Sequence, residues 1–222
     1  MFKSLFEKEW IKLRWVLLAY IIIGYAAIFS IGSDLQYGIK MHGAVKYWSN
    51  VITYHTNFFS ILKYLPIFGA ITLAVIQFVP ESINKRYRLS FHLPMNEQKL
   101  LIFMLLFGIV SMLLLDVLIA LGLFVVSGMF FPSDIVSISL VSIVPWFLAG
   151  IITYLGTSTV VIEPNWVQKV VIGITTYFTF ELLMAERLFT QYNNVLIYYF
   201  LITLIYGIII LFPGHRLRKG SK

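Results

Sequence analysis

The chain contains no cysteine, so disulfide bonds, thiolate metal sites and a cysteine nucleophile are all excluded. Charge is also scarce. Asp, Glu, Lys and Arg make up 12% of the 222 residues, against about 25% in soluble domains. Hydrophobic residues make up 59% of the chain. Because so little polar surface cannot cover a water-soluble domain, the composition predicts an integral membrane protein.

Motifs for common chemistry are missing as well. No G-x-x-x-x-G-K-[ST] phosphate loop occurs, so the chain is not expected to bind ATP in the P-loop manner. The four histidines are scattered, without H-E-x-x-H or other metal-binding spacing, and no G-x-S-x-G elbow is present. We therefore predict no catalytic residue, no metal ligand and no cofactor bound by this chain.

Long apolar segments dominate what is there. Six segments are long enough to be read as helices that cross a bilayer, which needs roughly 20 residues, and the third of them is longer than a membrane needs. They predict an all-α polytopic protein with one transmembrane domain over 1–222. The expected spans cover about 15–31, 58–79, 100–130, 135–155, 170–185 and 195–212. Within the second span, Ala70 and Ala74 form a small-xxx-small pair that suits close helix packing.

The basic residues give an orientation. The net charge of +7 does not indicate nucleic acid binding, because the basic residues lie at the ends of apolar segments, where lipid headgroups are. Six spans place both termini on one side. If that side is the inside, all but four of the 17 basic residues fall in inner segments. The exceptions are Lys40, Lys46, Lys63 and Arg187. The positive-inside rule therefore predicts N-in and C-in.

Residues 1–14 read as an amphipathic helix on the inner membrane surface, before a turn into the first span. Its apolar face is predicted to hold Phe2, Leu5, Phe6, Trp10 and Leu13, with Glu9 beside Trp10, and its charged face Lys3, Glu7, Lys8, Lys12 and Arg14. Two interpretations stay open. The segment is either a basic anchor that fixes topology or an element that moves with a partner.

The segment PESINKRYRLSFHLPMNEQK, residues 80–99, gathers charge in an otherwise apolar chain. Glu81 and Lys85 have the spacing of a helical ion pair. Pro94 ends any helix before it, and Asn96 suits the N-cap of the third span. We predict a short helix, a proline turn and a helix restart. This inner connector is either a docking surface for a protein or a solvated loop on headgroups.

Two acids lie within predicted spans, Asp116 and Glu181. A carboxylate at bilayer depth is costly unless it is paired, protonated or facing water. In a functional interpretation, they contribute polar contacts to a substrate path or to a seam between subunits. In a structural interpretation, each is either hydrogen-bonded within the helix packing or close to the membrane surface.

Three features together resemble one family. The first is the N-terminal segment LFEKEWIKLRW, which leads into the first span, and the second is the six-span layout. The third is the order of features in residues 81–99: an acid, a basic run, the pattern Leu-x-x-x-Leu-Pro and a polar restart before the third span. The chain resembles the permease subunit of an ABC-2 type exporter of the bacterial inner membrane. The resemblance covers the layout of the whole chain, and its residue content lies at about 8–14 and 81–99.

The resemblance implies partners. Such permeases dimerise, with a second copy or a paralogue, and associate with a cytoplasmic ABC ATPase that binds ATP and Mg. The connector would be the coupling helix, with the contact made by Glu81, Lys85, Arg86, Arg88, Leu89, Phe91 and Leu93. Glu7, Trp10 and Arg14 would belong to the elbow helix, and Glu163 and Trp166 to a smaller second contact.

The expected function is coupling of the partner's ATP hydrolysis to export, with no ATPase site on this chain. An apolar and aromatic lining favours an amphiphilic, lipid-like or peptide substrate. Two alternatives stay open: a membrane-embedded enzyme acting on lipid, and a non-transporting assembly or sensor subunit docked to an ATPase. Membrane lipids are expected partners in each case, and nucleic acid in none.

Overall fold

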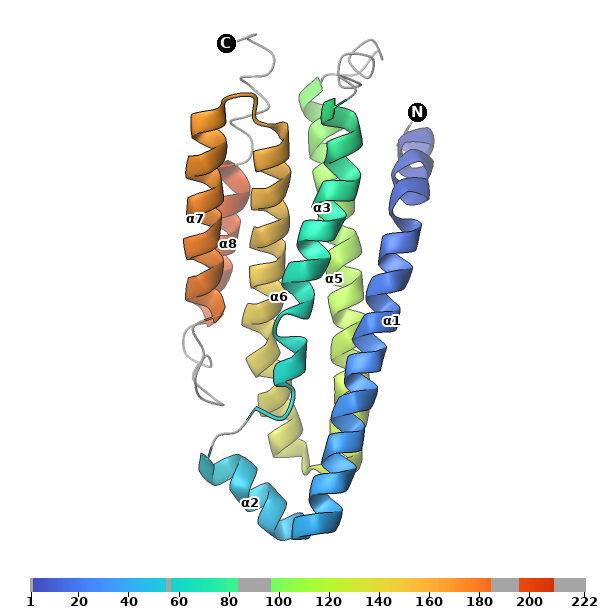
Figure 1. The fold of residues 1–222 in the computed structure, drawn as a ribbon, viewed down its shortest axis with the longest axis vertical. Coiled ribbons are helices and arrows are strands. Elements are labelled where there is room, and N and C mark those ends of the chain that lie inside the picture. The colour runs from blue at the N-terminus through green and yellow to red at the C-terminus, as the bar shows by residue number, and fades with distance from the viewer. Residues whose placement is uncertain (1, 55–56, 84–96, 185–195, 210–222) are drawn as a thin grey trace.

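A computed structural model describes residues 2–54, 57–83, 97–184 and 196–209 of the chain. Every regular element in these ranges is a helix, which confirms the all-α prediction (Figure 1). The elements are α1 (Phe2–His42), α2 (Ala44–Tyr54), the short 3₁₀ helix η1 (Ser60–Leu62), α3 (Leu65–Ile83), α5 (Glu97–Phe130), α6 (Ser133–Ile162), α7 (Trp166–Met184) and α8 (Leu196–Ile209).

Within the described ranges, five stretches are long and apolar enough to cross a bilayer. They are Lys3–His42, Ser60–Ser82, Leu100–Phe130, Ser133–Ile162 and Trp166–Met184. The chain is therefore a multi-pass membrane protein. The predicted sixth span, 195–212, corresponds to α8, whose apolar part Leu196–Tyr206 is shorter than these five. Part of that span lies outside the described residues.

Helix α1 corrects one prediction. No break separates residues 1–14 from the first span, because Phe2–His42 is one continuous helix. At 1.5 Å per residue it is about 60 Å long, roughly twice the hydrocarbon thickness of a bilayer. Its buried stripe is Leu5, Glu9, Leu13, Leu17 and Tyr20, which continues across the expected turn at Arg14. Packing against the bundle on both sides of that position keeps the helix continuous.

The predicted outer segment 32–57 is largely helical. Gly43 separates α1 from α2 with a φ of 79°, a left-handed conformation that suits glycine. Helix α2 then crosses the end of the bundle (Figure 1). The indole Nε1 of Trp48 donates a hydrogen bond to the carbonyl of Phe130 at 2.9 Å, which satisfies one of the last carbonyls of α5. Tyr47 stacks on Phe131 with the ring centroids 6.3 Å apart.

Helix α6 is the centre of the bundle and contacts α3, α5, α7 and α8. Its buried serine and threonine hydroxyls do not need partners on other helices, because they bond to the carbonyl four residues earlier. Thr153, Ser158 and Thr159 all do so, at 2.7–2.8 Å. The small pair Ala70 and Ala74 is completely buried on α3, as the prediction of close helix packing requires.

The two edges of the bundle differ in burial. Helix α1 lies at one edge, and α7 and α8 lie at the other (Figure 1). On α7 only Thr176, Leu183 and Met184 are buried. The side chain of Thr176 shares a hydrogen bond with the Tyr206 hydroxyl of α8. Most of the other apolar side chains of this edge are exposed, as expected for a surface in contact with lipid or another subunit.

Candidate functional site

One end of the bundle carries a group of buried polar side chains. The start of α1, the last turn of α3, the first turn of α5 and the turn between α6 and α7 all lie at this end (Figure 1). The connector 84–96 therefore begins and ends here, at Ile83 and Glu97. Helix α2 and the end of α5 lie at the opposite end (Figure 1). The polar group thus lies at the end of the bundle where the two helices that flank the connector predicted to dock a partner end and begin.

Glu81 is one of the two acids of this group and lies in the last turn of α3. Its side chain is only 2% exposed. The Glu81 Oε1 atom accepts hydrogen bonds from Lys8 Nζ at 2.8 Å and from Lys12 Nζ at 2.7 Å. The two lysines lie four residues apart on α1, so they present their ammonium groups on one face of that helix. Glu81 therefore ties the start of α1 to the end of α3.

The polar contacts continue inward from Lys12. Lys12 also donates to Glu9 Oε1 at 3.0 Å, and Glu9 is 1% exposed. Gln77 Nε2 donates to Glu9 Oε2 at 2.9 Å and to the carbonyl of Met104 on α5 at 2.8 Å. The hydroxyl of Tyr154 on α6 donates to Gln77 Oε1 at 2.7 Å. We call Lys8, Glu9, Lys12, Gln77, Glu81 and Tyr154 the polar cluster.

A glycine on α5 makes room for the inner end of the polar cluster. A Cβ atom at Gly108 would overlap the Tyr154 hydroxyl and approach Gln77 Oε1 at 2.9 Å. Only glycine therefore lets α5 pass this close to the Gln77–Tyr154 pair. The polar cluster consequently joins four helices, α1, α3, α5 and α6, through side chains far apart in the sequence.

The charges of the polar cluster balance, with two lysines against two glutamates. Glu9 and Glu81 are buried, whereas the side chains of Lys8 and Lys12 keep 40% and 20% exposure. Buried carboxylates are tolerated when they are paired and hydrogen-bonded, and removal of one partner is then strongly destabilising. The Oε2 atom of Glu81 accepts no hydrogen bond from any described residue. The polar cluster therefore has one unused acceptor beside the connector.

The structure corrects the predicted faces of the N-terminal segment. Lys8 and Lys12 do not lie on an outer charged face, because both bond to Glu81. Glu81 is paired with α1, and its predicted partner Lys85 lies outside the described residues. Trp10 and Phe6, placed on the apolar face by the prediction, are about half exposed. The helix is rotated so that Leu5, Glu9 and Leu13 face the bundle.

The remaining elbow residues lie on the outside of α1. Glu7 and Arg14 are exposed. The Arg14 guanidinium carbon lies 5.5 Å from the centroid of the Trp15 ring. Neither residue takes part in an ion pair within the described ranges.

The two residues of the predicted second contact, at the turn between α6 and α7, differ in exposure. Trp166 is 75% exposed, whereas Glu163 is 1% exposed. The Glu163 Oε1 atom accepts a hydrogen bond from the Asn165 backbone at 3.4 Å, and Asn165 Oδ1 accepts one from the Val167 backbone at 3.0 Å. These bonds shape the start of α7. Trp166 is thus available to a partner, while Glu163 serves the turn.

The six other connector residues named by the prediction lie outside the described residues. They are Lys85, Arg86, Arg88, Leu89, Phe91 and Leu93. The predicted short helix and proline turn lie there as well. Helix α5 begins at Glu97, directly after the predicted N-cap Asn96.

The two intramembrane acids have different environments. Asp116 is 2% exposed, and its Oδ1 accepts a hydrogen bond from the Tyr20 hydroxyl at 3.0 Å. Gly69 on α3 lets the Tyr20 ring reach it, because a Cβ there would overlap that ring. Glu181 is exposed on α7. The two acids share no polar partner within the described ranges, so no convergent acid pair forms there.

Sequence reasoning missed Glu9, Gln77, Tyr154 and Tyr20 as interacting residues. A signal existed for Gln77, which is the only strongly polar residue in the apolar stretch ITLAVIQFV. Within the part of the chain that the structure describes, no group of three or more His, Asp or Glu side chains is placed to hold a metal ion.

Comparison with known proteins gives no relative. No family model, no curated protein and no solved structure matches this chain.

Proposed function

We propose that this chain is the membrane-spanning permease subunit of an ABC-2 type exporter, in a bacterial inner membrane. In this proposal it has six spans with both termini inside, pairs with a second permease copy or paralogue, and docks a cytoplasmic ABC ATPase. The ATPase binds ATP and Mg, and this chain has no ATPase site. The exported substrate is amphiphilic, lipid-like or a peptide.

One observation carries the proposal: the burial of Glu81 between Lys8 and Lys12, directly before the connector. A coupling element must pass force from a docked ATPase to several helices at once. If α3 ended freely, a push on the connector would only bend or unwind its last turn. Because the polar cluster joins this turn to α1, α5 and α6, the same push displaces four helices together.

The charge distribution supports the same orientation. The lysines of the polar cluster are neutralised by Glu9 and Glu81, so they add little to an outer basic surface. The connector carries Lys85, Arg86 and Arg88 beyond it. In this proposal these cations meet an acidic cleft on the ATPase. Trp166, exposed at the same end of the bundle, offers a second apolar contact.

Co-purification tests the docking step. The chain is co-expressed with a candidate ABC ATPase partner, and the double variant Arg86→Glu/Arg88→Glu is compared with Lys40→Glu/Lys46→Glu. The control pair changes the same number of charges at the opposite end of the bundle (Figure 1). We expect the first variant to lose the ATPase and the second to retain it. Equal retention by both variants, each eluting as a folded protein, contradicts the proposal.

ATPase activity in proteoliposomes tests the coupling step separately. Glu81→Gln leaves the connector cations in place but removes the charge that holds α1 to α3. The variant is expected to keep the ATPase bound and to lose substrate stimulation of ATP hydrolysis. Retained stimulation with an intact complex would show that the polar cluster transmits nothing.

A further inference from the structure

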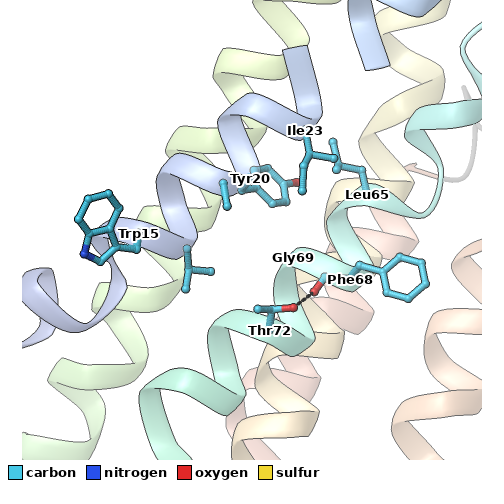
Figure 2. Close-up of a pocket in the computed structure, with 9 residues that line it drawn as sticks. Trp15, Tyr20, Ile23, Leu65, Phe68, Gly69 and Thr72 are labelled. Carbon is cyan, nitrogen blue, oxygen red and sulfur yellow. Dashed lines mark hydrogen bonds between the residues drawn. The ribbon is translucent and has the colours of Figure 1, made fainter. Parts of the chain in front are cut away.

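A pocket of about 390 Å³ opens between α1 and α3, further along the seam that begins at the polar cluster (Figure 2). Its floor is the Tyr20 ring, which is 7% exposed, and its walls include Trp15, Ile23 and Phe68, all more than half exposed. A buried floor between exposed walls describes a groove that is open to the surroundings. The volume lies in the range typical of small-ligand sites.

Apart from the indole N–H of the exposed Trp15 at one end, the polar groups that line the groove already have partners. Of its two hydroxyls, that of Tyr20 points inward and donates to Asp116 at 3.0 Å. The Thr72 hydroxyl donates to the carbonyl of Phe68 at 2.8 Å (Figure 2). What the groove offers a ligand is therefore hydrocarbon and aromatic surface, which suits an apolar chain.

The length of the groove matches one leaflet. From Trp15 to Ile23 helix α1 rises about 12 Å, at 1.5 Å per residue. Half of the hydrocarbon core is about 15 Å. Trp15 lies at the end nearer the N-terminus, where an aromatic belt residue is expected at the membrane–water boundary. The groove thus runs from the headgroup region toward the middle of the bilayer.

An unpaired cation lies beside Trp15, the lining residue at the end of the groove nearer the N-terminus: the Arg14 guanidinium carbon is 5.5 Å from the Trp15 ring centroid. Arg14 precedes Trp15, is exposed, and makes no ion pair within the described ranges. Lys8 and Lys12, by contrast, are paired with the acids of the polar cluster. A guanidinium binds phosphate oxygens with two parallel hydrogen bonds. The Arg14 guanidinium and the groove together therefore offer an anion-binding group beside one end of an apolar groove whose length suits an acyl chain.

We propose that the groove holds one acyl chain of a bilayer glycerophospholipid whose phosphate binds Arg14. The lipid contacts α1 and α3 together, directly below the polar cluster that also joins them. This inference does not depend on an ATPase partner, so it stands or falls separately from the proposed function.

Photolabelling of the full chain tests the inference. The protein is reconstituted in phosphatidylethanolamine vesicles containing a phosphatidylglycerol with a diazirine on its acyl chain. A matched diacylglycerol with the same diazirine lacks the phosphate. We expect the phosphatidylglycerol label on residues 15–23 of α1 and on residues 65–72 of α3.

Two pairs of variants separate chain binding from headgroup binding. Ala19→Phe fills the groove, whereas Ala26→Phe adds the same ring to an exposed position of α1 outside it. We expect at least a fivefold loss of labelling for the first and no change for the second. Arg14→Gln should lower phosphatidylglycerol labelling by about fivefold. It should leave diacylglycerol labelling unchanged, and Lys3→Gln should change neither.

The contrary outcomes are distinct. Equal labelling in Ala19→Phe and Ala26→Phe would mean that lipid contacts α1 without a specific site. Cross-links between two copies of the chain at this groove would mean that a second subunit covers it. Each result overturns the inference. Ala19→Leu, a smaller filling residue, replaces Ala19→Phe if the latter does not elute as a folded protein.

Discussion

The two lysines that bind Glu81 should differ in their effect on stability. The side chain of Lys8 is 40% exposed and bonds only to Glu81 among the described residues, while that of Lys12 is 20% exposed and bonds to Glu81 and Glu9. A surface ion pair is worth about 0–1 kcal/mol. Breaking a buried pair costs about 3–5 kcal/mol. Lys8 is close to the first case and Lys12 to the second.

The expected values follow from what each variant leaves behind. Lys8→Gln leaves Glu81 bound to Lys12, so we expect a loss below about 1 kcal/mol in the free energy of unfolding. Lys12→Gln leaves Glu9 with Gln77 as its only described partner and Glu81 with Lys8. Because Glu81 keeps one lysine, we expect the lower end of the buried range, about 3 kcal/mol.

Equilibrium unfolding in mixed detergent–SDS micelles measures these differences, with circular dichroism or the fluorescence of the five tryptophans as the signal. Lys3→Gln is the control for loss of an exposed lysine, and we expect a change within about 0.5 kcal/mol. The double variant of Lys12→Gln with Glu81→Gln should show a coupling energy of at least about 1 kcal/mol. Equal losses for Lys8→Gln and Lys12→Gln, or no coupling, would refute the reasoning.

Three further predictions concern helix packing. Gly108→Ala should destabilise by about 1–3 kcal/mol in the same unfolding assay, because the new methyl group overlaps Tyr154. Gly128→Ala, where a Cβ meets nothing within 4 Å, should be neutral or stabilising, and equal losses at both glycines would contradict this explanation. Tyr20→Phe leaves Asp116 without its donor and should cost about 1–3 kcal/mol, whereas Asp116→Asn keeps the acceptor and should cost less. Trp48→Phe removes the hydrogen bond to the last carbonyl of α5 and should cost about 1 kcal/mol, with amide hydrogen exchange rising at the end of α5. Unchanged exchange there would show that the bond contributes nothing.

The positions of the membrane helices could be predicted well from the sequence. Helix α5 over Glu97–Phe130 agrees with the predicted span 100–130, and α7 over Trp166–Met184 contains most of 170–185. The reason is that the bilayer fixes the length of an apolar run, and backbone groups in hydrocarbon must be satisfied within a helix. Helix ends were less predictable. Helix α6 covers Ser133–Ile162, whereas the predicted span is 135–155. Outside the hydrocarbon a helix has no fixed length, because water can satisfy its backbone groups.

The candidate site was less predictable. Glu81 was singled out from the sequence, but its expected partner was Lys85, four residues away on the same helix. The partners in the structure are Lys8 and Lys12, and Lys12 is 69 residues away. Local spacing can identify a charge that needs a partner. It cannot say which helix brings one, because that depends on how the bundle packs.

The sequence by itself determined that this protein is apolar, helical and membrane-spanning, because those properties follow from composition and from the length of each apolar run. Only the tertiary structure decided that α1 is one continuous helix and that Lys8, Glu9 and Lys12 are neutralised within the bundle. The charges of residues 7–14 are typical of a surface helix when read alone. Packed beside Glu81 and Gln77, the same segment gains buried partners, and the turn that its sequence indicated is no longer required.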